Sequence, residues 1–182
     1  MFTMLCGFGS ILMEFSSTAG VAISLTGESG SAKTGALKAA TSIWGEPENV
    51  YATTTTPLAL QQRFLTLHSL PVGWDEVGNR SAYHISDFVL GVSSGKAKLR
   101  MQASSNQEPA RLIEFTVRKP KAFMDNARIG KEIFDVFNSD YGWAGPDFVK
   151  AVYAYGDIPK IKANLAKWEQ RFVEDFGNDM EY

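Results

Sequence analysis

One stretch decides the fold: Gly27-Glu28-Ser29-Gly30-Ser31-Ala32-Lys33-Thr34, which directly follows the apolar, alternating segment 20–26. The alternation predicts a strand, and the residues from 33 to about 43 have the pattern of a helix. The stretch matches the phosphate-binding pattern G-x-x-x-x-G-K-[ST] at Gly27, Lys33 and Thr34, with Ala32 where glycine is usual. A loop of this kind between a strand and a helix predicts nucleoside triphosphate binding.

The chemistry of a triphosphate explains these residue types. Its negative charges are met by backbone N–H groups at a helix N-terminus, and glycine lets the backbone curl around them. We expect residues 27–34 to bind ATP, with Lys33 reaching the β/γ-phosphates and the Thr34 hydroxyl binding Mg²⁺. If the φ angle of Ala32 is positive, alanine in place of glycine destabilises the loop by about 1–2 kcal/mol. If the angle is negative, the methyl group only narrows the space through which the phosphates approach the backbone. The alternative is a turn of small residues that precedes a helix.

A pair of acidic residues follows a second apolar segment, 67–74. We expect a short strand over 70–75, although Pro71 and Gly73 both weaken a central strand. In an ATPase, Asp75 would hold Mg²⁺ and Glu76 would be the general base that polarises the attacking water. The alternative for this pair is a solvated turn.

Composition sets outer limits on the function. The 182 residues, 45% hydrophobic and 21% charged, suit one globular domain. The net charge of −2 gives no overall basic field for nucleic acid, and the single cysteine, Cys6, excludes a disulfide framework. The apolar segment 1–13 has no positive region before it and is too short to span a bilayer. We expect a cytoplasmic protein without membrane contact, in which this segment is a buried helix beside the first strand.

Strand and helix patterns alternate along the first two thirds of the chain. This order predicts an α/β fold, a P-loop NTPase three-layer sandwich with a mainly parallel sheet and a helical C-terminal part. We expect a single domain over 1–182, with the nucleotide-binding core at about 1–120 and the helical region at about 121–182. The predicted strands are 20–26, 50–53, 70–75, 98–103 and 111–118, and the predicted helices are 33–44, 58–66, 82–92, 126–138, 145–154 and 158–176.

Two motifs and several shorter blocks carry a family resemblance. The specific ones are 25–34 (LTGESGSAKT) with 37–47 (LKAATSIWGEP), and 70–76 (LPVGWDE); the shorter blocks are 53–57, 94–100, 104–106 and 138–145. The chain resembles the domain-of-unknown-function 927 family, helicase-like P-loop ATPases of phages, prophages and mobile elements. The resemblance implies an ATP hydrolase that works on DNA during replication, as a homo-oligomeric ring on single-stranded DNA.

Further site residues follow from this resemblance. It implies that Asn106 is the polar sensor of the γ-phosphate, and that Lys96, Arg100 or Arg111 is the cation that stabilises transition-state charge, with Arg111 taken as the candidate catalytic residue. A solvated basic turn and strand is the alternative for these three cations. The chain departs from the family at Ala32 and in a shorter stretch between residues 100 and 104. Because it begins just ahead of the loop, we expect a natural fragment or a minimal version.

Two other functions stay open. The first is a degenerate nucleotide-binding or assembly module without turnover, which Ala32 and the short sensor region favour. The second is a kinase for a small molecule or nucleotide, which would need an arginine-rich lid that the scattered arginines do not suggest. Aromatic residues in the last third would stack on bases if exposed, but at helical spacing we expect them in the core. They are Phe134, Phe137, Tyr141, Trp143, Phe148, Tyr153 and Tyr155.

Overall fold

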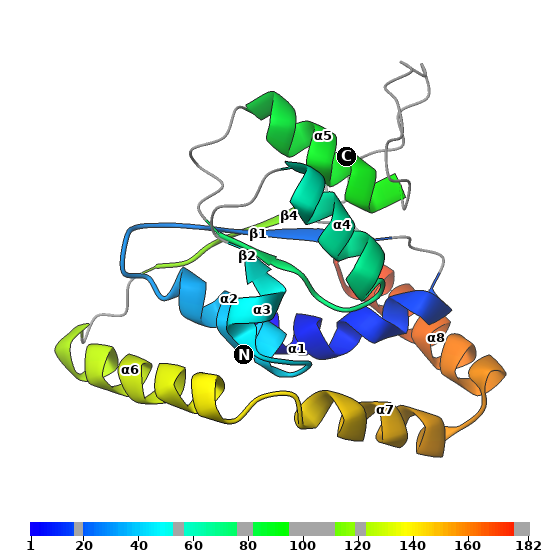
Figure 1. Cartoon of the computed structure of the whole chain (residues 1–182). Helices are drawn as coiled ribbons and strands as arrows, with labels where there is room; N and C mark the ends of the chain where they lie inside the picture. Colours follow the sequence, from blue (N-terminus) through cyan, green and yellow to red (C-terminus); the bar gives the residue numbers. More distant parts are fainter. Residues whose placement is uncertain (17–19, 53–56, 76–81, 95–111, 119–122, 177–182) are drawn as a thin grey trace.

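The structure is a computed structural model of the whole chain, and it describes residues 1–16, 20–52, 57–75, 82–94, 112–118 and 123–176 (Figure 1). The strands are β1 (Ala22–Thr26), β2 (Tyr51–Ala52), β3 (Gly73–Trp74) and β4 (Leu112–Thr116). The helices are α1 (Phe2–Gly9), the 3-10 helix η1 (Ser10–Phe15), α2 (Lys33–Ser42), α3 (Pro47–Val50), α4 (Pro57–Leu67), α5 (Ala82–Ser94), α6 (Phe123–Ser139), α7 (Ala144–Tyr155) and α8 (Ile158–Phe176).

The described strands form two parallel pairs. In the first, β1 lies beside β4 from Ala22–Leu112 to Thr26–Thr116, and Val117 N–H extends the ladder with a 2.7 Å bond to the Thr26 carbonyl. In the second, β2 pairs with β3, so that Ala52 lies opposite Trp74. Figure 1 shows α4 and α5 on one side of the strands and α1, α2 and α3 on the other. Parallel pairing with helical connections is the pattern of an α/β protein.

Most predicted elements are present with shifted ends. The helix predicted from residue 33 begins at Lys33, and those predicted in the last third are α6, α7 and α8. The strand predicted over 70–75 is reduced to Gly73–Trp74, since Pro71 has no N–H to contribute to a ladder. The strand predicted over 98–103 lies outside the described residues. The three-layer sandwich stays a prediction. The helices on both sides of the strands are compatible with it.

The helix at the N-terminus packs against α2. Trp44 donates its indole N–H to the Gly7 carbonyl at 2.7 Å, and a Cβ at Gly7 would lie 2.6 Å from the Ala40 carbonyl oxygen. Glycine therefore sets how closely the two helices approach. The prediction of a buried helix beside the first strand is wrong, because Leu5 is 60% exposed and the main contact is with α2. Thr3, Met4 and Cys6 are half-buried, and Gly7 is the one fully buried residue of α1.

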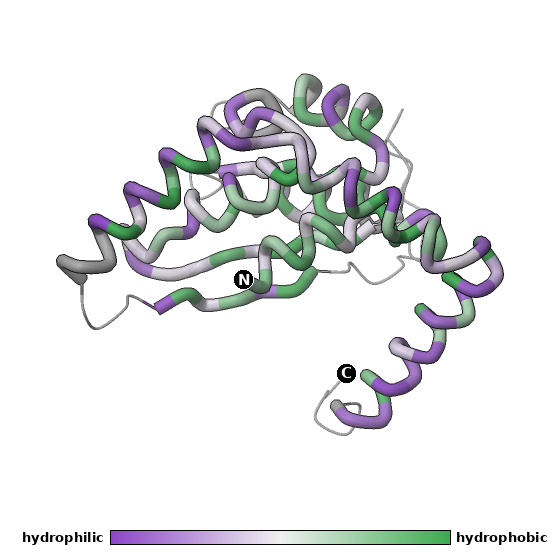
Figure 2. Tube along the Cα trace, turned by 90° about the horizontal axis from the view of Figure 1, so that it is seen from below, coloured by the Kyte–Doolittle hydropathy of each residue, from purple (hydrophilic) through white to green (hydrophobic). Residues whose placement is uncertain are grey.

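The helical region beyond β4 is attached to the first half of the chain through α2. Two backbone hydrogen bonds reach the end of α2: Gly142 N–H, in the link between α6 and α7, donates to Ser42 at 2.7 Å, and Gly145 N–H, in the first turn of α7, donates to Ile43 at 2.9 Å. Figure 2 shows the last helix, α8, extending away from the body toward the C-terminal end. No helix in the described ranges is both long and apolar enough to cross a membrane.

Three aromatic residues that the sequence analysis places in the core lie at the surface. Trp143, Tyr153 and Tyr155 are 79%, 64% and 50% exposed. They belong to α7 or to the residue just before it, and this helix turns one narrow face inward, through Gly145 and Phe148. Phe148 meets the ring of Phe8 at 5.1 Å. The placement in the core is therefore wrong for the first three residues and holds in part for Phe148, which is half-buried.

Candidate functional site

The loop between β1 and α2 has a backbone that favours glycine. Gly27 and Gly30 have φ angles of 138° and 77°, in the region that L side chains rarely adopt. At Gly27 a side chain is also excluded by space, because a Cβ there would lie 2.2 Å from the carbonyl oxygen of Val117. The chain thus turns sharply as it leaves the strand and reaches the first turn of α2 within six residues, 27–32.

Ala32 occupies the position just before α2 and has a left-handed backbone. Its φ and ψ are 62° and 25°, a left-handed conformation that glycine adopts more readily than alanine. Of the two cases considered from the sequence, the structure shows the one with positive φ. This conformation costs an alanine about 1–2 kcal/mol. The loop is therefore kept in shape by its surroundings, at a local cost in stability.

The side chain of Lys33 folds back across the loop. Its ammonium group donates to the carbonyl oxygens of Gly27 and Glu28, both at 2.8 Å, and to the hydroxyl of Ser31 at 3.2 Å. Ser31 is buried, at 4% exposure. The Lys33 ammonium group is thus held against the loop, next to the N-terminus of α2. The helix dipole adds partial positive charge at the same place.

Asp75 and Thr34 meet beside this loop. The Thr34 hydroxyl donates a 2.6 Å hydrogen bond to Asp75 Oδ2. Thr34 lies in the first turn of α2, and Asp75 follows the last residue of β3. Trp74 packs its ring against Phe88 of α5, with 4.8 Å between centroids, which anchors the end of β3. The structure therefore brings together the two residues that the sequence analysis assigned to Mg²⁺.

Comparison with known families places this geometry in context. Residues 1–110 match the family described as Domain of unknown function (DUF927). The chain belongs to this family. In this DUF927 protein the matched segment contains the whole loop 27–34 and Asp75, and it ends before β4 begins. No curated protein and no solved structure matches the chain.

The remaining predicted site residues of this DUF927 protein lie outside the described part of the chain. They are Glu76, Lys96, Arg100, Asn106 and Arg111. Their roles therefore stay predictions. Sequence reasoning expected Phe134 in the core but missed its contact with Gly35: a Cβ at Gly35 would lie 2.8 Å from the ring of Phe134, which brings α6 onto the first turn of α2. The only signal was a glycine inside a helical pattern.

The oxygen atoms at the site suit Mg²⁺. This ion binds proteins through one or two carboxylates, keeps several waters and takes further oxygen ligands from phosphates. Thr34 and Asp75 supply one hydroxyl and one carboxylate, 2.6 Å apart. Within the described ranges, no three residues among His, Cys, Asp and Glu gather as a metal site. A metal at Thr34 and Asp75 would take the rest of its coordination from water and phosphate oxygens, as Mg²⁺ usually does.

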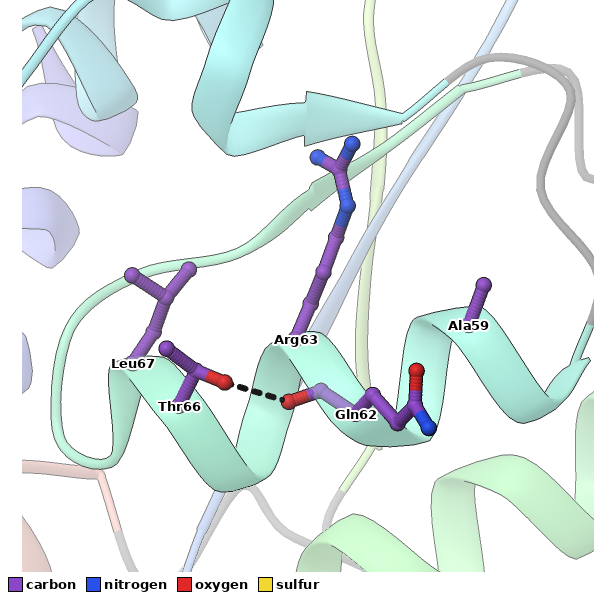
Figure 3. Close-up of a pocket in the computed structure, with 5 residues that line it drawn as sticks. All are labelled: Ala59, Gln62, Arg63, Thr66 and Leu67. Atoms are coloured by element: carbon purple, nitrogen blue, oxygen red, sulfur yellow. Dashed lines mark hydrogen bonds between the residues drawn. The ribbon is translucent and has the colours of Figure 1, made fainter.

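A separate hollow of about 370 Å³ lies along α4 of this DUF927 protein (Figure 3). Among the residues that the structure describes, its lining comes from that one helix: Ala59, Gln62, Arg63, Thr66 and Leu67. The Thr66 hydroxyl donates to the Gln62 carbonyl at 2.9 Å, a bond within the helix that stabilises no ligand (Figure 3). Because this hollow contains neither the loop nor Asp75, it does not form part of the candidate site.

Proposed function

We propose that this DUF927 protein is a P-loop ATPase that binds Mg²⁺–ATP on the loop 27–34. One observation carries the proposal: the Thr34 hydroxyl bonds Asp75 at 2.6 Å beside the loop in which Lys33 is held. A turn of small residues alone would explain the loop, but it would not explain why a carboxylate from another strand end meets the threonine of the motif. The strand, loop and helix order is also the one that the phosphate motif needs.

Each residue of the site has a chemical role in this proposal. The N–H groups at the start of α2 would donate to phosphate oxygens. Lys33 would exchange the carbonyl oxygens of Gly27 and Glu28 for those of the β- and γ-phosphates, which carry full charge and bind an ammonium more strongly. Thr34 and Asp75 would hold Mg²⁺, which neutralises charge that develops on the phosphates.

Turnover would need the residues outside the described ranges. We assign Glu76 to the general base, Asn106 to sensing the γ-phosphate and Arg111 to stabilising transition-state charge, as the family resemblance implies. We also propose the three-layer sandwich for the fold. Work on single-stranded DNA by a homo-oligomer completes the proposal. The exposure of Trp143 and Tyr153 supports it, since exposed aromatic rings are the groups on which unpaired bases stack.

Ala32 favours a second function, nucleotide binding without turnover. Its φ of 62° puts an alanine methyl on a loop whose usual glycine lets phosphate approach closely. If the methyl of Ala32 displaced the γ-phosphate, ATP would still bind, but the γ-phosphate would be misplaced for attack by water. Hydrolysis would then be slowed more than binding is weakened. The family match is compatible with both functions, because its description assigns no activity.

The decisive experiment measures Mg²⁺-dependent ATP binding and hydrolysis, with and without single-stranded DNA, for the parent chain and for Lys33→Ala. Lys131→Ala is the matched control, because it removes an exposed lysine on α6. Binding and turnover that are lost only in Lys33→Ala support the ATPase. Binding without turnover in the parent supports the second function. Equal ATP affinity in the parent and Lys33→Ala refutes both.

A further inference from the structure

The last helix carries a continuous apolar seam. Ile158, Ile161, Leu165, Trp168 and Phe172 follow one another at alternating spacings of three and four residues. This spacing places them on one stripe of the helix, as at the a and d positions of a coiled coil. Such a stripe is wide enough to pack against another helix along the whole length of α8.

The chain itself covers the middle of this seam, whereas Ile158 at its start is 48% exposed. Ile161 is 4% exposed and Leu165 is half-buried, and both border a hollow of about 280 Å³. Leu12 of η1 and Phe148 of α7 lie on the same hollow, so its lining is mainly apolar. An apolar hollow of this kind would accept a large hydrophobic side chain from outside.

The second half of the seam extends away from the body (Figure 2). Trp168 is 58% exposed and Phe172 is 54% exposed. Arg171 lies 5.4 Å from the centroid of the Trp168 ring, so a cation rests against this indole, which is still mostly in solvent. Leaving a tryptophan this exposed forgoes the hydrophobic free energy of burying it.

The charges of α8 differ between its two halves. The segment 158–168 has three lysines and no acidic residue, whereas 169–176 has three acidic residues and one arginine. Two copies of the helix laid antiparallel would therefore set a basic half against an acidic half at both ends. Complementary charge of this kind steers association and fixes its register.

Two charges sit directly beside the seam. Lys162 and Glu169 are both exposed and seven positions apart, so they flank the same side of the stripe. Neither has a charged residue three or four positions away on α8, the spacing at which a helix pairs its own charges. In an antiparallel pair, Lys162 of each copy would face the partner's Glu169.

We propose that α8 is the docking surface for a second copy of this chain. The two α8 helices lie antiparallel about a two-fold axis, and Trp168 of each copy enters the apolar hollow beside Ile161 and Leu165 of the other. This contact is isologous, since the same surface of each copy supplies both the tryptophan and the hollow. A second copy fits better than another partner because seam, hollow and charges all complement themselves. The inference does not depend on ATP binding.

Sedimentation equilibrium tests the contact. The parent chain should form dimers in the micromolar range, and Trp168→Ser should weaken the dimer at least about tenfold, because buried tryptophans dominate interface energies. Trp143→Ser is the matched control, since that tryptophan is 79% exposed but lies off α8. A parent chain that stays monomeric, or a dimer that both serine variants weaken equally, overturns the proposal.

Charge exchange gives a test that does not depend on removing a large side chain. Lys162→Glu and Glu169→Lys should each weaken the dimer about fivefold, because one substitution turns two symmetric attractions into repulsions. The double variant should return to the affinity of the parent. A double variant weaker than both single variants would show that these residues do not face each other, and circular dichroism checks that all variants are equally helical.

Discussion

The hydroxyl of Thr34 and the carboxylate of Asp75 are joined by a 2.6 Å hydrogen bond across 41 positions of sequence. This bond connects the first turn of α2 with the end of β3, two elements that are themselves packed together. A ligand held between these oxygens would therefore be positioned by secondary structure and not by a loop alone. Sites built in this way hold their geometry more closely.

Removal of the Thr34 hydroxyl should destabilise the protein even without a ligand. Thr34→Val keeps the size of the side chain but loses the donor to Asp75, and hydrogen bonds to charged groups contribute about 1.5–3 kcal/mol. We expect the free energy of unfolding, measured with urea, to fall by about 1–2 kcal/mol because the pair is only part-buried. Thr34→Ser should stay within about 0.5 kcal/mol. Equal losses in both variants would contradict the bond.

Glycine at position 32 should stabilise the loop. Ala32 has a φ of 62°, so Ala32→Gly relieves strain of about 1–2 kcal/mol, of which the greater freedom of glycine in the unfolded chain takes back part. We expect a net gain of about 0.5–1 kcal/mol in the free energy of unfolding. Ala36→Gly, inside α2, should instead lose about 1 kcal/mol. The same sign for both substitutions would show that position 32 is not strained.

The contact between Gly35 and Phe134 should give a strong double-mutant coupling. Alanine at 35 favours the helix by about 1 kcal/mol, but in the parent its Cβ would lie 2.8 Å from the Phe134 ring. We expect Gly35→Ala to destabilise the parent and to stabilise a Phe134→Ala background. The interaction energy from four urea titrations should reach about 1–2 kcal/mol. Additive effects would mean that α6 does not rest on α2 here.

The thiol of Cys6 should react slowly with alkylating agents. Burial raises the pKa of this half-buried thiol, because a thiolate loses more solvation than a thiol, and the thiolate is the reactive form. The midpoint of the rate–pH profile with iodoacetamide should therefore lie above that of a small free thiol. In urea the midpoint should move down to the ordinary value. A native midpoint at or below that value would disprove the burial effect.

Local patterns predicted the local structure of the site. The alternation before residue 27 and the motif after it located β1, the loop and the start of α2 at Lys33. The motif could not show that Ala32 adopts the left-handed backbone, because that depends on what surrounds the loop. Nor could it show the bond from Thr34 to Asp75, since the distance between two segments follows from packing and not from either segment.

Amphipathic patterns predicted helices but not what covers them. In α8 the same seam is buried at Ile161 and 58% exposed at Trp168. In α6, Phe134 rests on Gly35 while Ile133 and Val136 are 46% and 53% exposed. Periodicity measures only the chemical asymmetry of a helix. The partner of each face is a property of the assembled protein, so helical spacing alone could not show that Tyr153 and Tyr155 lie at the surface.

The pairing of β1 with β4 means that the segment matched by the family does not coincide with the unit that folds together. The family segment ends at residue 110, yet among the described strands the one that lies against β1 begins at Leu112. The carbonyl groups at the end of α2 likewise accept hydrogen bonds from the backbone N–H groups of Gly142 and Gly145, which also lie beyond the family segment. A chain shortened to residues 1–110 would lack β4, so the edge of β1 that β4 covers would be left without its partner. Open strand edges of this kind favour aggregation. The residues beyond the family segment therefore cover one edge of β1 and hydrogen-bond to the end of α2.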